Sequence, residues 1–198
     1  NRLNSASIVI TNHNAQVFPE LRYQDCQVGE DRRVRYDRIV CDVPCSSDAA
    51  IRKIPTKWQE WNTKGGQSLH ALQHDLERGI ELLKVGGKIT YSTCSLNPIE
   101  NESVVAAALK KFPGKIRLVN AEQTMEGFRF QQGLTNWPFL HMKKKSDCEA
   151  IDEQKKSLLM KQREGLLQPF GYFEQYQNFE EVPVNQRAQV RDTMFANH

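Results

Sequence analysis

Residues 36–44 read YDRIVCDVP, and this stretch decides the fold class. Aromatic and β-branched residues favour a strand from Tyr36 to Val43, which Pro44 ends. Residues 88–94, KITYSTC, predict another strand. The residues between them predict one long helix that ends at Gly86-Gly87, because apolar side chains recur in steps of three and four: Leu69, Leu72, Leu76, Ile80 and Leu83.

Two further apolar runs predict outer strands, SIVIT at residues 7–11 and KIRLV at residues 115–119. Asn97 is expected to cap a helix that Pro98 begins. Alternating strands and helices indicate an α/β fold, a doubly wound parallel sheet with helices on both faces. The pattern fades near residue 121. We therefore predict a core at 1–121, and loops and a polar helix continuing the same domain at 122–198.

Composition narrows the class of protein further. Hydrophobic residues make up 39% of the 198-residue chain and charged residues 26%, which is typical of a soluble globular protein. No apolar run approaches the roughly 18 residues that a membrane span needs. Five cysteines are an odd number, so a closed disulfide framework is not expected and a reducing compartment is favoured. The start of the chain has neither an initiator Met nor the pattern of a signal peptide.

A net charge of +3 is too weak to indicate a nucleic-acid-binding protein by itself. Basic residues nevertheless gather in two short segments, at 32–38 and at 143–145. Two interpretations stay open for each segment, a solvated charged loop or a site of phosphate contact.

Cys45 and Cys94 follow two of the predicted strands directly. Ligands bind outside the carboxyl ends of parallel strands, so both thiols would face one crevice if the strands are neighbours. Cys94 also precedes a predicted helix, whose positive N-terminal end favours a thiolate. Spacing alone leaves open a structural role or a redox pair for the two thiols. His70 and His74 are expected on a solvated helix face, since no third metal ligand accompanies them.

Two motifs resemble the signatures of the Sun-domain RNA (cytosine-5) methyltransferases. They are DVPCS at residues 42–46 and YSTCSLNPIENE at residues 91–102. The likeness runs from Arg2 to about Ala121 and is strongest to the eukaryotic and fungal branch that acts on tRNA. It implies a Rossmann-like class I fold, S-adenosylmethionine as cofactor without a metal, RNA (most of all tRNA) as partner, and no membrane. It also implies a location in the nucleus, the nucleolus included, or in the cytoplasm.

The resemblance also implies roles for individual residues. Cys94 would attack C6 of cytosine, which activates C5 for methylation, and Cys45 would assist breakdown of the covalent adduct. Asp42 would face both the cytosine and the methyl donor. The remaining implied positions are two further cofactor contacts, Asn14 and Pro44, and two RNA contacts, Arg52 and Lys53. The basic segment at 32–38 adds Arg32 and Arg33 as predicted RNA contacts.

Three departures from the family pattern keep an alternative open. The family's usual Gly-Asp-Gly reads Ser47-Asp48-Ala49 here, and its frequent Asp is Asn14. The Gly-rich cofactor loop and the closing Gly-Gly-Phe-Phe hairpin are expected outside residues 1–198, so the sheet would be incomplete at both ends. A non-catalytic RNA-binding relative is the alternative to an enzyme, and a thiol redox protein is a third hypothesis.

Overall fold

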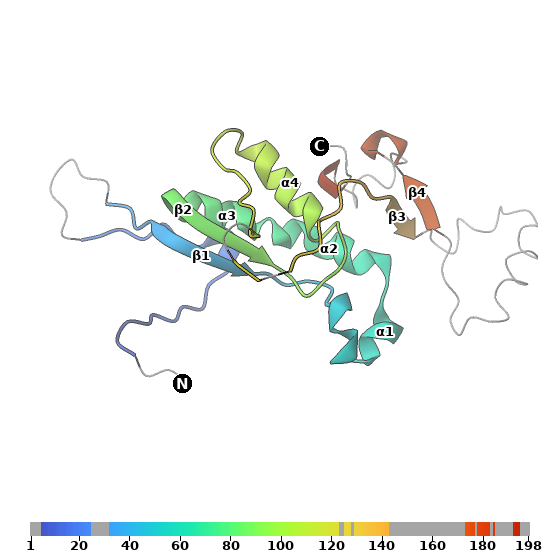
Figure 1. The fold of residues 1–198 in the computed structure, drawn as a ribbon, viewed down its shortest axis with the longest axis horizontal. Helices are drawn as coiled ribbons and strands as arrows, with labels where there is room; N and C mark the ends of the chain where they lie inside the picture. The colour runs from blue at the N-terminus through green and yellow to red at the C-terminus, as the bar shows by residue number, and fades with distance from the viewer. Residues whose placement is uncertain are drawn as a thin grey trace, which may run out of the picture.

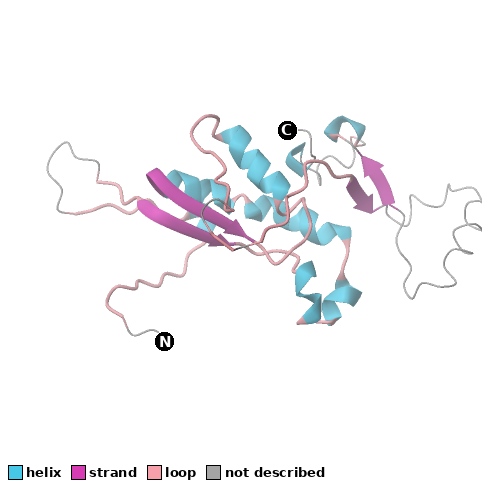
Figure 2. Ribbon diagram, viewed as in Figure 1, coloured by secondary structure: helices cyan, strands magenta, loops and turns pink. Residues whose placement is uncertain are grey.

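A computed structural model describes residues 5–24, 32–122, 125–127, 129–142, 173–176, 178–182, 184 and 192–194. Figures 1 and 2 show mixed helices and strands around a small parallel sheet. The helices and strands of the described chain are η1 (Ala15–Val17), β1 (Tyr36–Asp42), η2 (Asp48–Arg52), α1 (Thr56–Glu60), α2 (Thr63–Gln73), α3 (Asp75–Leu82), β2 (Leu83–Ser92), α4 (Glu102–Lys111), β3 (Phe139–Met142), β4 (Phe173–Tyr176), η4 (Phe179–Glu181) and η6 (Asp192–Met194).

The central pair of strands confirms the prediction made from the two Cys-bearing stretches. β1 and β2 run parallel, with Cys41 opposite Tyr91 and Asp42 opposite Ser92. Both strands therefore end at the same edge of the sheet. α3 crosses close behind them at Gly79, where an added Cβ would lie 2.7 Å from Ile89 Cδ1. Gly79 thus allows a helix-to-sheet approach that a larger residue would block.

The helix predicted between the strands is divided and ends early. α2 ends at Gln73, α3 begins at Asp75, and β2 already begins at Leu83. The prediction that Gly86 ends the helix is wrong, because Gly86 lies within β2 and has a φ of +78°. The register shifts at this point, which accommodates extra β2 residues opposite β1. The left-handed backbone at Gly86 therefore allows this irregularity in β2.

The two predicted outer strands, at 7–11 and 115–119, are both wrong. Neither segment pairs with another strand in the described chain, and apolar side chains in both are exposed, with Val9 87% and Leu118 68% accessible. β-propensity produces a strand only where a neighbouring backbone completes the hydrogen-bond ladder. These runs have the composition of strands but lack that neighbour among the described residues.

Helices cover one face of the β1–β2 pair (Figure 1). Leu76 of α3 packs with Val104 and Ala108 of α4, and Ile89 and Tyr91 of β2 lie against this cluster. Alternate side chains point to the opposite face, where Val40 is 77% exposed. The expectation of helices on both faces is therefore not met by the described residues, which supply cover for one face only.

A second apolar cluster joins the later part of the chain to the loop after β2. Ile99 packs with Phe139, Val182 and Met194, and the Trp137 indole donates a hydrogen bond to the Met194 carbonyl (3.1 Å). β3 and β4 pair antiparallel where the sequence predicts loops. The polar helix expected at 151–167 lies outside the described residues, as do Cys26 and Cys148.

His70 corrects another expectation, since its side chain is fully buried rather than solvated. Its Nδ1 lies 2.7 Å from the Ile99 carbonyl and its Nε2 lies 2.8 Å from Thr193 Oγ1. His74 instead pairs with Glu77 at 2.9 Å. These contacts give both imidazoles structural roles. In the ranges that the structure describes, no helix has the length and apolarity to cross a membrane.

Candidate active site

Cys45 and Cys94 meet at the carboxyl ends of β1 and β2, as the strand positions predict. Their sulfur atoms lie 3.3 Å apart, and the Cys94 amide N–H donates to Cys45 Sγ at the same distance. Both are free thiols; Cys94 is exposed and Cys45 is half-buried. The parallel register brings the two thiols together because β1 and β2 stop at one edge of the sheet.

The surroundings shift the pKa values of the two thiols in opposite directions. Hydrogen bonds with Ser47 and Cys45 lower the pKa of Cys94, against smaller opposing effects of burial and of the Asp42 carboxylate. Burial raises the pKa of Cys45, and its hydrogen bond to Cys94 raises it further. Within this pair the thiolate therefore forms on Cys94, which is also the thiol that solvent and a substrate can reach.

The predicted effect of a helix N-terminus on Cys94 is not supported by the geometry. Residues 98–101 form a turn, and α4 begins only at Glu102. Asn97 accepts from the Ile99 N–H at 3.0 Å and so caps this turn, whereas Asn101 is the residue before the helix. The field of a helix terminus acts mainly within its first turn, so Cys94 lies beyond its useful range.

The loop after Cys45 contacts the Cys94 loop, although Ser47 and Ala49 stand where the resembled family has glycines. Ser47 adopts a φ of +60°, the one positive φ among the described non-glycine residues. Its hydroxyl lies 3.2 Å from Cys94 Sγ and 3.3 Å from the Cys45 carbonyl. The Ala49 amide then donates to the Cys94 carbonyl at 3.2 Å. The altered loop thus remains attached to the Cys94 loop through both backbone and side chain.

Glu100 joins the two cysteine loops from beneath. Its carboxylate is fully buried and accepts hydrogen bonds from the Ser46 amide (2.8 Å), the Ser46 hydroxyl (2.5 Å), the Ser95 hydroxyl (2.7 Å) and the Gln73 amide (3.0 Å). Ser46 follows Cys45 in the chain and Ser95 follows Cys94. One carboxylate therefore fixes the position of both thiol-bearing loops relative to α2.

Glu100 was missed as a site residue by sequence reasoning, in which it appears only as part of the motif at 91–102. The available signal was its place in the motif, six residues after Cys94. Gly66 of α2 belongs to the same arrangement, because a Cβ there would lie 2.3 Å from the Asn97 amide nitrogen and 3.2 Å from the Glu100 carboxylate. A side chain at this position would require the Asn97 and Glu100 side chains to shift.

Asp42 and Pro44 lie beside the thiols, as predicted. The exposed Asp42 carboxylate accepts from the Ser92 hydroxyl at 3.3 Å, and the Pro44 carbonyl accepts from Gln73 at 3.0 Å. Asn14 precedes η1 and accepts from the Gln16 amide through its side-chain oxygen (3.1 Å). In the described chain no hydrogen bond joins Asn14 to Asp42 or to either thiol.

The four predicted RNA contacts divide between opposite ends of β1. Arg52 is the last residue of η2 and Lys53 follows it, on the cysteine side, and the described residues give their exposed side chains no ion pair. Arg32 and Arg33 precede β1, where Arg33 forms an isolated bridge with Arg22. The structure brings the first pair to the thiol end of the sheet and does not bring the second pair there.

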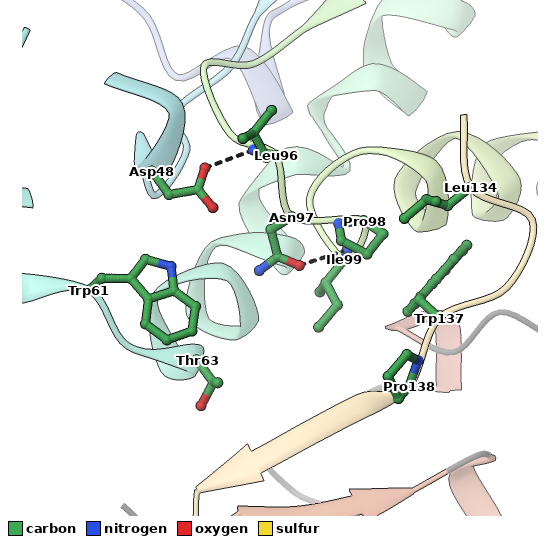
Figure 3. Close-up of a pocket in the computed structure, with 10 residues that line it drawn as sticks. All are labelled: Asp48, Trp61, Thr63, Leu96, Asn97, Pro98, Ile99, Leu134, Trp137 and Pro138. Carbon is green, nitrogen blue, oxygen red and sulfur yellow. Dashed lines mark hydrogen bonds between the residues drawn. The ribbon is translucent and has the colours of Figure 1, made fainter. Parts of the chain in front are cut away.

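A pocket of about 340 Å³ opens beside the Cys94 loop (Figure 3). Trp61 stands on one side and Trp137 on the other, with Pro98 between them. Asp48 lines the same pocket, and one of its oxygens accepts from the Leu96 amide at 2.7 Å. The walls are thus mainly aromatic and apolar, with a carboxylate at the rim. A site of this size suits one small planar group.

The described ranges contain no cluster of three or more side chains suited to hold a metal ion. The candidate site is therefore built from two thiols, one exposed carboxylate and an aromatic pocket. Such an arrangement suits nucleophilic chemistry on a planar, electrophilic substrate.

Comparison with known proteins identifies the family of the chain. Residues 1–161 match the family model described as 16S rRNA methyltransferase RsmB/F. The chain is 47% identical over 156 residues to the multisite-specific tRNA:(cytosine-C(5))-methyltransferase of Saccharomyces cerevisiae, covering 76% of this chain and 23% of the relative. It is 43% identical over 137 residues to the tRNA (cytosine(34)-C(5))-methyltransferase of Drosophila melanogaster, covering 69% and 18%.

A bacterial relative is more distant. The ribosomal RNA small subunit methyltransferase F of Cronobacter sakazakii is 32% identical over 119 residues, which cover 59% of this chain and 24% of the relative. The chain belongs to the RsmB/F methyltransferase family, which confirms the resemblance seen in the two motifs. It spans about a fifth to a quarter of the length of these relatives.

Proposed function

We propose that the protein methylates C5 of cytosine in RNA, with tRNA as the substrate and S-adenosylmethionine as the methyl donor. The observation that carries this proposal is the Cys45–Cys94 pair, 3.3 Å apart at the ends of two parallel strands. The names of the fungal and insect relatives support the choice of tRNA and of C5. A Rossmann-like class I fold is part of the same proposal.

Cys94 is the nucleophile in this proposal because it is the exposed thiol with the lowered pKa. Its thiolate adds to C6 of the cytosine and makes C5 nucleophilic. When bound, S-adenosylmethionine would supply the methyl group to C5, and loss of the C5 proton to solvent would then expel the Cys94 thiolate and restore the aromatic ring. Cys45 keeps its proton because burial raises its pKa, so it can assist the breakdown of the adduct.

Asp42 suits a contact with the methyl donor, because its carboxylate is negatively charged and the donor is a cation. Its carboxylate is exposed at the same sheet edge as the thiols, and one of its oxygens has no hydrogen-bond partner in the described chain. We assign the cofactor contacts to Asp42 and Pro44 at this edge, and to Asn14, whose amide nitrogen also has no partner among the described residues. A target base held in a helix must leave its stack to reach the thiols.

The Trp61 pocket and the cations on η2 supply the RNA contacts in this proposal. An aromatic side chain stacks on any base, and Arg52 and Lys53 offer charge to the phosphates nearby. The altered Ser47-Asp48-Ala49 loop favours a non-catalytic RNA-binding relative on sequence grounds alone. The altered loop is weaker support for that alternative once its contacts are considered, because Ser47 contacts Cys94 and the two thiols remain in contact.

Methyl transfer to a tRNA transcript tests the proposal. The natural protein at full length, radiolabelled S-adenosylmethionine and the transcript should give 5-methylcytosine, identified after nuclease digestion. Calorimetry with S-adenosylmethionine separates the alternative. RNA binding without any binding of the cofactor would support the non-catalytic relative and overturn the proposal.

A further inference from the structure

The contact between Ser47 and Cys94 assigns a function to a residue that departs from the family pattern. We propose that the Ser47 hydroxyl stabilises the reactive thiolate of Cys94 by donating a hydrogen bond to its sulfur. This inference rests on the proposed role of Cys94 as the nucleophile, and extends it to the group that supports its charge.

The Ser47 hydroxyl lies between two groups that can accept its proton, the Cys94 sulfur and the Cys45 carbonyl. While Cys94 is a thiol, it donates to Ser47 Oγ at 3.2 Å and the Ser47 hydroxyl donates to the Cys45 carbonyl at 3.3 Å; Cys45 Sγ is farther away, at 3.7 Å. A hydroxyl has one proton and rotates to the acceptor that binds it best. A thiolate cannot donate, so once Cys94 is deprotonated the proton in this contact comes from Ser47, and hydrogen bonds to a charged acceptor are the stronger ones.

The backbone of Ser47 gives a second, independent observation. Its φ of +60° belongs to the left-handed region, which glycine adopts without a steric penalty and serine adopts less readily. Ser47 has a Cβ in a conformation that glycine would occupy more easily. A hydroxyl placed 3.2 Å from the exposed thiol is a contact that glycine could not make.

The other groups around Cys94 leave a place for such a donor. Cys45 is the other side chain that stabilises the thiolate by a hydrogen bond, and Asp42 opposes ionisation through its negative charge. In the part of the chain that the structure describes, no cationic side chain contributes to the shift, and α4 begins too far along the chain to help. Ser47 provides the largest favourable effect on the Cys94 pKa.

Alkylation by iodoacetamide, followed peptide by peptide across a range of pH, tests the assignment without RNA or cofactor. The natural full-length protein is compared with Ser47→Gly and Ser47→Ala. Ser68→Ala is the matched control, because among the described residues its exposed hydroxyl donates to the Gly65 carbonyl on α2 and to no other group. Glycine suits a positive φ, so Ser47→Gly removes the hydroxyl without imposing backbone strain.

We expect both Ser47 variants to raise the Cys94 pKa and to lower its alkylation rate about tenfold at pH values below the wild-type pKa, the factor that corresponds to one pH unit. The control should follow the wild-type profile. A wild-type Cys94 profile in either Ser47 variant would overturn the proposal, since both lack the hydroxyl. The chemistry of the thiol is read directly, so the result stands whether or not methyl transfer is detected. If the alkylation shift appears while methylation is absent from every form, only the proposed function fails.

Discussion

The sulfur atoms of Cys45 and Cys94 lie 3.3 Å apart, yet their environments shift the two pKa values in opposite directions. Hydrogen bonds lower the pKa of the exposed Cys94, and burial raises that of Cys45. Two neighbouring thiols with separated acidities can divide the work of one reaction, because one is charged while the other keeps its proton.

This separation predicts an order of alkylation in the wild-type protein. As the pH rises, Cys94 loses its proton first and should react with iodoacetamide at a lower pH than Cys45. Below the lowered pKa of Cys94 both thiols are protonated and both rates should fall. Mass spectrometry of the two cysteine peptides measures the rates separately. Reaction of Cys45 before Cys94 would contradict the assignment of the thiolate.

Glu100 should be essential to the stability of the site. Glu100→Ala leaves the Ser46 amide and one N–H of the Gln73 side chain without a buried acceptor, at a cost of about 3 kcal/mol in the free energy of unfolding. Glu100→Gln is the matched variant, because one amide oxygen still accepts these bonds and the amide nitrogen can donate to the two serine hydroxyls. Urea unfolding measures both. An equal loss in the two variants would contradict a role that depends on hydrogen-bond geometry.

Trp61 should contribute to RNA affinity by stacking on a base in the pocket. Trp61→Ala is expected to weaken binding of a single-stranded RNA by about 1–3 kcal/mol, or about 5- to 150-fold. Trp58→Ala is the control, since Trp58 lies on α1 and does not line the pocket. Fluorescence anisotropy with labelled RNA measures both. Equal losses in the two variants would rule out a specific role for the pocket.

The cations beside η2 should make RNA binding sensitive to salt. Replacing both Arg52 and Lys53 by Ala removes two phosphate contacts and should reduce the slope of log K against log salt by about 1.4 for single-stranded RNA. The pair Arg32 and Arg33 precedes β1, at the opposite end from the thiols, and its replacement should change the slope less. Binding titrations at several salt concentrations measure the slope for each double variant. A larger change in slope for the Arg32 and Arg33 variant would contradict the assignment of the phosphate contacts to Arg52 and Lys53.

The two strands that carry the cysteines could be predicted because each run contains its own signals, β-branched residues followed by a turn. Parallel pairing then places Cys45 and Cys94 at one edge. Residues 7–11 and 115–119 have the same composition, yet they form no strand in the described chain. The composition of a segment indicates whether it is suited to form a strand. A strand also needs a neighbouring strand to pair with, and a short sequence window does not contain that neighbour.

The role of Glu100 could not be read from periodicity. Its four hydrogen bonds reach Ser46 and Gln73, which lie 54 and 27 residues away in the chain, as well as Ser95 nearby. The prediction that Gly86 ends a helix was wrong for a related reason. A positive φ suits both the end of a helix and an irregular strand, and only the pairing of β1 with β2 decides between them.

Trapping on RNA that carries 5-azacytidine tests most directly whether Cys94 is the nucleophile. This base has nitrogen in place of C5, so there is no C5 proton to remove after methyl transfer and the covalent adduct persists. The natural full-length protein and Cys45→Ala should both give a species on denaturing gels that contains protein and RNA, and Cys94→Ala should give none. A covalent species that survives in Cys94→Ala would contradict the assignment of the nucleophile.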